Sequence, residues 1–168
     1  YVSSERIEVM ILYHGSSIEV KKPILLKNQR ELDFGKGFYT TSDLEQAAKW
    51  AKRTAKRRGV DKAFVTVYEV DNNDINNIRL LNFDSPNKDW LDFVVKNRKG
   101  EYIAENWDVI SGPVADDQTA QVIDLYLDGL YDEEEAIRRF LTQRIKDQYA
   151  FKTDEALKLL IFKEVITL

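Results

Sequence analysis

The sequence contains no cysteine and only one histidine, His14. Without cysteine, neither a disulfide bond nor thiol catalysis is available, and a single histidine argues against a zinc site, so we expect no metal. No apolar run approaches the length of a membrane-spanning helix, and the first residues lack the basic and then apolar layout of a signal peptide. We therefore expect a cytoplasmic protein without a membrane partner.

The rest of the composition is that of a globular domain. Hydrophobic residues make up 43% of the chain and charged residues 32%, which is typical of soluble proteins. Because 168 residues are the size of one domain, we expect residues 1–168 to form a single unit. Residues 1–9 carry no strong pattern and are expected to be a flexible N-terminal extension. The net charge of −4 gives no overall attraction to nucleic acid, which would need a local basic patch.

Three common catalytic signatures are absent. Serine hydrolysis is a poor fit, because His14 is the only available base and Ser16 beside it has no nucleophile elbow around it. The segment Gly35-Lys36-Gly37 lacks the spacing of a phosphate-binding Walker loop. It also lacks the third glycine and the downstream acidic residue of a Rossmann dinucleotide fingerprint.

Strand and helix patterns alternate irregularly along the chain. We expect strands at residues 10–13, 63–70, 78–83, 107–110, 148–152 and 160–168. We expect helices at residues 43–58, after Ser85-Pro86, at 117–127, at 132–144 and after Thr153, with a polar turn at 71–77. A capping box of Ser42 and Glu45 opens the helix at 43–58, which stops at Gly59. Since the regular rhythm of a doubly wound sheet is missing, the pattern predicts an α+β fold.

Two stretches predict a pocket. Leu12-Tyr13-His14-Gly15-Ser16 places the only histidine at the end of the first strand. Some twenty residues later, Asp33-Phe34-Gly35-Lys36-Gly37-Phe38-Tyr39-Thr40-Thr41 precedes a helix. Its glycines allow a positive φ or a close approach of the backbone to a ligand. Phe38 and Tyr39 point to opposite faces if they enter a strand, so one ring can face the core and the other a cleft.

These two stretches resemble the first two motifs of the diphtheria-toxin-like and poly(ADP-ribose) polymerase-like ADP-ribosyltransferases, the His-Tyr-Glu class. The chain also resembles DUF3990, a bacterial family of uncharacterised domains, from Met10 to the C-terminus. The motifs that carry this second resemblance are His14-Gly15-Ser16, residues 33–41, Gly112 to Asp117, and Gln148, Phe151 and Thr153 in the order Gln-x-x-Phe-x-Thr. The resemblance implies an ADP-ribosyltransferase-like fold of split antiparallel β-sheets with flanking helices.

The resemblance also implies roles for individual residues. In the resembled class, the histidine hydrogen-bonds the adenosine ribose of NAD and the next residue holds the nicotinamide amide through its backbone, which His14 and Gly15 match. Tyr39 is expected to stack on nicotinamide, with Trp50 as the second aromatic wall of the slot. The expected NAD-binding set is His14, Gly15, Ser16, Gly35, Gly37, Tyr39 and Trp50.

The third motif departs from the class. Polymerase-like members carry Asn-Glu-Tyr where this chain has Asp147-Gln148-Tyr149, so the expected catalytic set is His14, Tyr39 and Gln148. A glutamine can hydrogen-bond the nicotinamide ribose, but it cannot ionise and therefore cannot act as a general base. The acceptor then needs its own reactive group or a base from elsewhere, and Asp116, Asp117 and Asp147 are unranked candidates.

The first expectation is therefore an NAD-dependent mono-ADP-ribosyltransferase that acts on a protein or nucleic-acid acceptor. The resemblance implies a bacterial toxin of a toxin–antitoxin or phage-defence module, with an antitoxin protein as its partner. One alternative is a catalytically silent module that binds NAD or ADP-ribose. Another is an RNA- or DNA-directed enzyme of the same fold.

A basic helix face and ordinary packing remain open as further interpretations. Lys49, Lys52, Arg53, Lys56, Arg57 and Arg58 lie on the helix after the second motif. They form either a solvated flank or a track for a nucleic-acid acceptor or the NAD pyrophosphate. Taken singly, His14, Tyr39 and Trp50 also fit structural roles, and the two glycines fit a tight turn.

Overall fold

A computed structural model describes residues 8–27, 29, 32–101 and 106–168, and it gives an α+β fold. The strands are β1 (Val9–Ser16), β2 (Phe38–Thr40), β3 (Phe64–Asp71), β4 (Leu80–Asn82), β5 (Val109–Pro113), β6 (Asp147–Phe151) and β7 (Ile161–Thr167). The helices within these residues are α1 (Leu44–Arg58), α2 (Asn72–Asn76), α3 (Lys88–Arg98), α4 (Gln118–Leu127), α5 (Glu133–Leu141) and α6 (Asp154–Leu157). Residues 1–7, most of the expected N-terminal extension, lie outside the described part of the chain.

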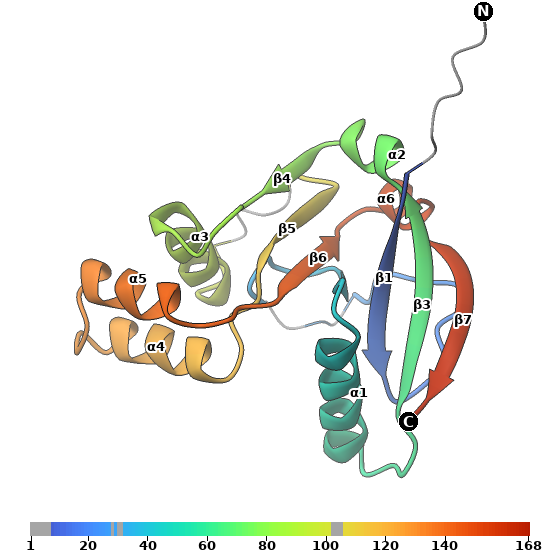
Figure 1. Ribbon diagram of the computed structural model, residues 1–168, viewed down its shortest axis with the longest axis horizontal. Helices are drawn as coiled ribbons and strands as arrows, with labels where there is room; N and C mark the ends of the chain where they lie inside the picture. Colours follow the sequence, from blue (N-terminus) through green and yellow to red (C-terminus); the bar gives the residue numbers. More distant parts are fainter. Residues whose placement is uncertain (1–7, 28, 30–31, 102–105) are drawn as a thin grey trace, which may run out of the picture.

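The strands form two sheets that meet edge to edge. The first sheet has the order β1-β3-β7 and the second the order β2-β6-β5-β4. They are joined where Tyr13 of β1 pairs with Thr41 just after β2, through N–H to carbonyl hydrogen bonds of 2.8 and 2.9 Å. Figure 1 shows α1 beneath this junction, and α3, α4 and α5 on the far side of the second sheet.

The expectation that both sheets are wholly antiparallel is wrong for one pair. The first sheet is antiparallel throughout, and so are β2 with β6 and β5 with β6. In contrast, β4 runs parallel to β5. The reason lies in the connection, because α3 lies between these two strands in the chain and a helical crossover returns the chain to the same end of a sheet.

Helix α1 packs closely against the first sheet because its inner face is small. Ala47, Ala51 and Ala55 are buried together with Val65 of β3. The helix ends at Gly59, whose φ of 67° is the left-handed conformation that terminates helices. Its expected start is corrected by one residue, since the side chain of Asp43, and not that of Ser42, accepts the hydrogen bond from the Gln46 N–H.

Other boundaries shift because local side chains cap the elements. Residues 71–77, expected to be a turn, contain the short helix α2, which Asp71 caps. Asn87 caps α3, so this helix starts after Ser85-Pro86 and not directly at it. The first strand continues beyond Tyr13 through Ser16, so His14 lies within the strand and not after its last residue.

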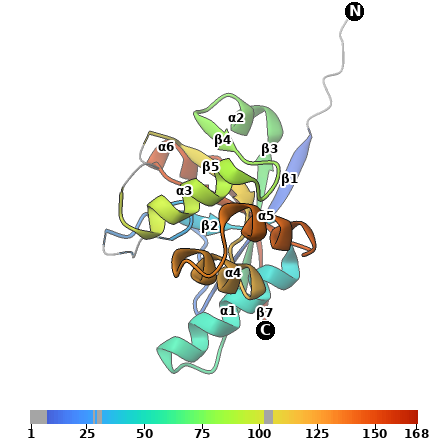
Figure 2. The ribbon, with the colours of Figure 1, turned by 90° about the vertical axis from the view of Figure 1, so that its left-hand side faces the viewer.

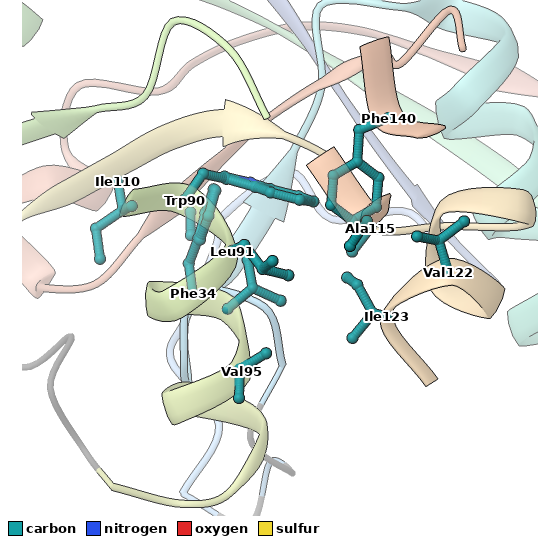
Figure 3. Packing of buried hydrophobic residues seen from close by; sticks show 12 residues of the cluster. Phe34, Trp90, Leu91, Val95, Ile110, Ala115, Val122, Ile123 and Phe140 are labelled. Atoms are coloured by element: carbon teal, nitrogen blue, oxygen red, sulfur yellow. The ribbon is translucent and has the colours of Figure 1, made fainter. Parts of the chain in front are cut away.

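The second sheet is supported by a core in which three helices meet. Figure 3 shows Trp90 and Leu91 of α3 facing Ile123 of α4 and Phe140 of α5. Figure 2 views the molecule from this side. The indole N–H of Trp90 donates to the carbonyl oxygen of Pro113 at 2.9 Å in a buried contact. This core therefore fixes the end of β5, which forms part of the candidate site described next.

Candidate functional site

A cleft of about 610 Å³ lies where the two sheets meet. Its walls come from the end of β1, the segment that leads into β2, the outer face of α1, the segment after β5, and β6. Among the predicted site residues, those that line it are His14, Gly15, Ser16, Gly37, Tyr39, Trp50 and Gln148. This volume is in the range of small-molecule sites.

The imidazole of His14 is held in one orientation. Its Nδ1 lies 2.7 Å from the carbonyl oxygen of Tyr39, and since a carbonyl only accepts, Nδ1 carries the proton. The ring stacks on Phe38 with 4.0 Å between centroids. Burial lowers the pKa of His14 from 6.5 to about 4, and the hydrogen bond to Tyr39 offsets only part of this effect. A neutral ring with Nδ1–H presents Nε2 as an acceptor.

Phe38 and Tyr39 divide between core and cleft as their alternation predicts. Phe38 is 7% exposed and packs in the core between the sheets. Tyr39 is half-buried and lines the cleft. Its hydroxyl donates to the Gly35 carbonyl at 2.6 Å and accepts from the Phe34 N–H at 2.9 Å. The ring therefore lies against the cleft while its hydroxyl closes the turn before β2.

Gly35 and Gly37 play different parts in that turn. Gly35 has a φ of 76°, which a side chain would disfavour, and it is not among the residues that line the cleft. Gly35 therefore shapes the turn before β2, and its expected contact with a ligand stays a prediction. Gly37 does line the cleft, but its N–H already donates to Gln29 Oε1 at 2.9 Å.

Gly15 and Trp50 bring β1 and α1 together at the cleft. A Cβ on Gly15 would overlap the carbonyl oxygen of Ala47 and lie 2.7 Å from the Ala51 nitrogen. The glycine is therefore needed for the helix to approach the strand. Trp50 is half-buried on the same helix and lines the cleft, where the sequence predicts a second aromatic wall.

Gln148 lies at the floor of the cleft with 2% of its surface exposed. Its Nε2 donates to Asp33 Oδ2 at 3.1 Å and to the Pro113 carbonyl at 3.2 Å. Both amide hydrogens are therefore used. Because no residue in the described part of the chain donates to Oε1, the amide presents an acceptor to a ligand.

Asp33 is the site residue that sequence reasoning missed. It is 8% exposed and lines the cleft. Its Oδ1 accepts two hydrogen bonds from Arg98, at 2.9 and 2.8 Å, and its Oδ2 accepts from the Ala115 N–H at 2.9 Å as well as from Gln148. The only sequence signal was its position at the head of the glycine stretch, where an aspartate is also an ordinary turn former.

The three candidate bases are all engaged elsewhere. Asp147 accepts hydrogen bonds from Thr41 and Ser42 at the start of α1. Asp116 pairs with Arg53 and accepts from Gln46. Asp117 pairs with Lys49 and Arg53. Of these, only Asp116 lines the cleft, so the carboxylate that touches Gln148 is Asp33.

The cleft is more basic than the chain as a whole. Its lining includes Arg53, Arg57, Arg58 and Arg98, and within the described ranges Asp33 and Asp116 are the acidic lining residues. Arg53 and Arg98 are paired with these aspartates. Arg57 and Arg58 form no ion pair with any residue that the structure describes. The mouth of the cleft can therefore attract an anionic group.

A second hollow of about 670 Å³ lies beside the cleft. Asp116 and Val114 line both, while Lys49, Arg144 and Lys146 line only the second. The predicted histidine, tyrosine and glutamine do not line it. We therefore take the first cleft as the candidate site.

Comparisons with known proteins assign a family without an activity. A family model described as "Protein of unknown function (DUF3990)" matches residues 10–162. No curated protein and no solved structure matches. The described residues contain no cluster of three or more histidine, aspartate or glutamate side chains that could hold a metal ion. They also include no helix with the length and apolar character needed to cross a membrane.

Proposed function

We propose that this chain, which belongs to the DUF3990 family, binds NAD in the cleft between its two sheets and transfers ADP-ribose to an acceptor. The observation that carries the proposal is the convergence of His14, Tyr39 and Gln148 on one cleft. They come from three separate strands, β1, β2 and β6. If these three residues had only structural roles, we would not expect them to line the same cleft as Trp50 of α1.

The parts of NAD match the chemistry of different walls. Nicotinamide is a flat cationic ring, and Tyr39 and Trp50 supply aromatic faces, which favour such a cation by about 0.5–2 kcal/mol. His14 Nε2 and Gln148 Oε1 are acceptors that suit ribose hydroxyl groups. Arg57 and Arg58 at the mouth suit the pyrophosphate. The ribose hydroxyl groups, the nicotinamide ring and the pyrophosphate of NAD thus each have matching side chains in the cleft.

The proposed reaction breaks the bond between C1′ of the ribose and the nicotinamide nitrogen. The electron pair of that bond leaves with nicotinamide, which becomes neutral. An acceptor lone pair forms the new bond to C1′, and the acceptor proton passes to water. Gln148 orients the sugar but takes no proton, because an amide is not a base at neutral pH.

Nicotinamide release tests this proposal. The full chain is incubated with NAD and a cell lysate, nicotinamide is quantified, and proteins and nucleic acids are searched by mass spectrometry for added ADP-ribose. We expect release in the native chain and a loss of about 100-fold or more in Tyr39→Ala and Gln148→Ala. Tyr126→Phe, on α4 and outside the residues that line the cleft, is the control and should keep full turnover.

Absence of turnover with every lysate would overturn the transferase proposal. Equal turnover in the native chain and in both cleft variants would overturn it as well, provided that circular dichroism shows the variants to be folded. The resemblance to toxins further leads us to propose a neutralising antitoxin protein as partner, which a pull-down from cells that contain the neighbouring genes would identify.

A second candidate function is NAD or ADP-ribose binding without transfer. One observation favours it: Gln148 cannot ionise, and its amide hydrogens are held by Asp33 and Pro113. In that case NAD raises the melting temperature of the native chain without any nicotinamide release. The nucleic-acid alternative instead requires that Arg57→Glu weaken acceptor binding and lower its salt dependence.

A further inference from the structure

We propose that Asp33 and Arg98 are positioning residues that fix the Gln148 amide with its oxygen toward the ligand, so that the cleft requires glutamine, and not glutamate, at this position. The ligand side of this inference rests on the proposed NAD binding. The orientation of the amide does not, because it follows from contacts within the chain. The two parts can therefore be tested separately.

The first step is that both amide hydrogens of Gln148 are donated in hydrogen bonds. Its two acceptors, Asp33 Oδ2 and the Pro113 carbonyl, lie at 3.1 and 3.2 Å. Rotating the amide by half a turn would set the side-chain oxygen against both acceptors and leave no hydrogen between them. Since the residue is 2% exposed, water cannot compensate, and the observed orientation is strongly preferred.

The second step is the rigidity of the acceptors. Arg98 donates twice to Asp33 Oδ1 and the Ala115 N–H donates to Oδ2, so both oxygens of the carboxylate are held. Asn97, next to Arg98 on α3, donates to the Asp33 carbonyl at 3.1 Å. The Pro113 carbonyl also accepts from the buried Trp90 indole. Helix α3 therefore anchors both groups that hold Gln148.

The third step is the consequence for a glutamate at this position. Its carboxylate would face the Asp33 carboxylate at hydrogen-bond distance, where two like charges cannot both persist. It would also face the Pro113 carbonyl, which offers no hydrogen. Placing a negative charge at position 148 thus requires a captured proton or a displaced Asp33. The negative charge of this site lies instead on Asp33, which lines the cleft beside Gln148 and is paired with Arg98.

The remaining titratable and charged groups around Gln148 do not change this conclusion. Some of them face the cleft from β1, β2, α1 and the segment after β5. The others lie close to Gln148 on β6 or just after it, but their hydrogen bonds go to other parts of the chain. Those groups are His14, Tyr39, Arg53, Arg57, Arg58, Asp116, Asp147, Tyr149 and Lys152, of which Arg57 and Arg58 lie at the mouth of the cleft. Arg53 is occupied by Asp116 and Asp117, and Lys152 donates to backbone carbonyls of the turn before β2.

A test without ligand compares the thermal stability of Gln148→Glu with that of Gln148→Met, which removes the same hydrogen bonds without adding charge. The Asp33 carboxylate raises the pKa of a glutamate at position 148 in the folded chain above its value in the unfolded chain. The folded state of Gln148→Glu therefore loses stability as the pH rises. We expect the gap in melting temperature between the two variants to be wider at about pH 8 than at about pH 5, by about 3 °C or more.

The double variant Asp33→Asn, Gln148→Glu supplies the rescue. An asparagine amide at position 33 can donate to the introduced carboxylate, which reverses the native hydrogen bond, while it gives up the bond from the Ala115 N–H. That second loss does not depend on pH, so most of the pH-dependent loss should disappear. A pH-independent gap between Gln148→Glu and Gln148→Met, or an equal pH dependence in the double variant, would overturn the positioning of Gln148 by Asp33. This result holds whether or not the chain binds NAD.

A test with ligand compares NAD with an analogue that lacks the 2′-hydroxyl of the nicotinamide ribose. The native chain should bind NAD about 3- to 10-fold more tightly, as expected for one hydrogen bond to a buried acceptor. In Gln148→Met this preference should disappear. If Gln148→Met still prefers NAD to the analogue, Oε1 is not the ligand acceptor. If the native chain does not bind NAD at all, the proposed function is wrong.

Discussion

At the scale of single residues, His14 and Gln148 are held by hydrogen bonds that leave an acceptor atom of each side chain facing the cleft. His14 gives its Nδ1 hydrogen to the Tyr39 carbonyl, and Gln148 gives both amide hydrogens to Asp33 and Pro113. Each residue then presents one lone-pair atom on the other side. A ligand rich in hydroxyl groups, such as a nucleotide sugar, satisfies both atoms.

The half-buried His14 predicts a stability that depends on pH. Its pKa is near 6.5 in the unfolded chain and about 4 in the folded one, so the unfolded state binds the proton more readily between these values. The stability that the neutral ring contributes is therefore complete above about pH 6.5 and is lost as the pH falls toward about 4, by about 2–3 kcal/mol.

The substitution His14→Asn isolates this effect, because its amide can replace the Nδ1–H bond to Tyr39 without titrating. As the pH falls from about 6.5 to about 4, the melting temperature of the native chain should decrease more steeply than that of His14→Asn. Parallel curves would mean that His14 is solvated enough to protonate in the folded state.

The Tyr39 hydroxyl makes a second prediction at this scale. Tyr39→Phe removes its bonds to Phe34 and Gly35 but keeps the aromatic face. We expect chemical denaturation to show a loss of about 1–2 kcal/mol in the free energy of unfolding. NAD binding should weaken far less than in Tyr39→Ala, and an equal loss in both variants would show that the ring face does not contribute to binding.

Residue patterns predicted only part of this chemistry. His14, Tyr39 and Gln148, which line one cleft, were named because short motifs mark them. Asp33 and Arg98 were not, since their meaning depends on an ion pair between positions 65 residues apart, which no local pattern encodes. For the same reason, Asp116, Asp117 and Asp147 were named as unranked candidates for a base, whereas the fold pairs the first two with α1 and the third with residues just before it.

At the scale of elements, the contact between β1 and α1 decides the width of the cleft. Gly15→Ala would push its Cβ into the backbone of Ala47 and Ala51, which no side-chain rotation can relieve. We expect chemical denaturation to show a loss of about 1–3 kcal/mol, together with weaker NAD binding because Trp50 moves with the helix.

Gly59→Asn is the matched control for this prediction. Gly59 has open space around it and a φ of 67°, which asparagine tolerates better than most residues. A change of less than about 1 kcal/mol is expected there. Equal losses at the two positions would contradict the close approach of strand and helix.

Elements with a strong period were predicted well. Helix α1 and strand β3 match their expected ranges to within about one residue, because alanine spacing and strict alternation identify them. The parallel pairing of β4 with β5 was missed, since both strands are short and strand direction follows from the α3 crossover and not from strand composition.

At the scale of the whole molecule, the candidate cleft lies where two sheets meet edge to edge. The bridge between Tyr13 and Thr41 is the point at which the sheets join, and the cleft opens beside it. The α+β class could be predicted from the order of the elements. The meeting of β1, β2 and β6 around one site was expected only from the family resemblance, because it depends on pairings between the two ends of the chain that no local pattern encodes.

Tryptophan fluorescence titrated with NAD tests the central claim that this cleft is an NAD site. Trp50 lines the cleft, whereas Trp90 is buried and Trp107 packs against the helical core. Excited at the red edge of tryptophan absorption, the native chain and Trp107→Phe should both be quenched by NAD in a saturable way, and Trp50→Phe should not. Absence of quenching in the native chain, or undiminished quenching in Trp50→Phe, would contradict the account.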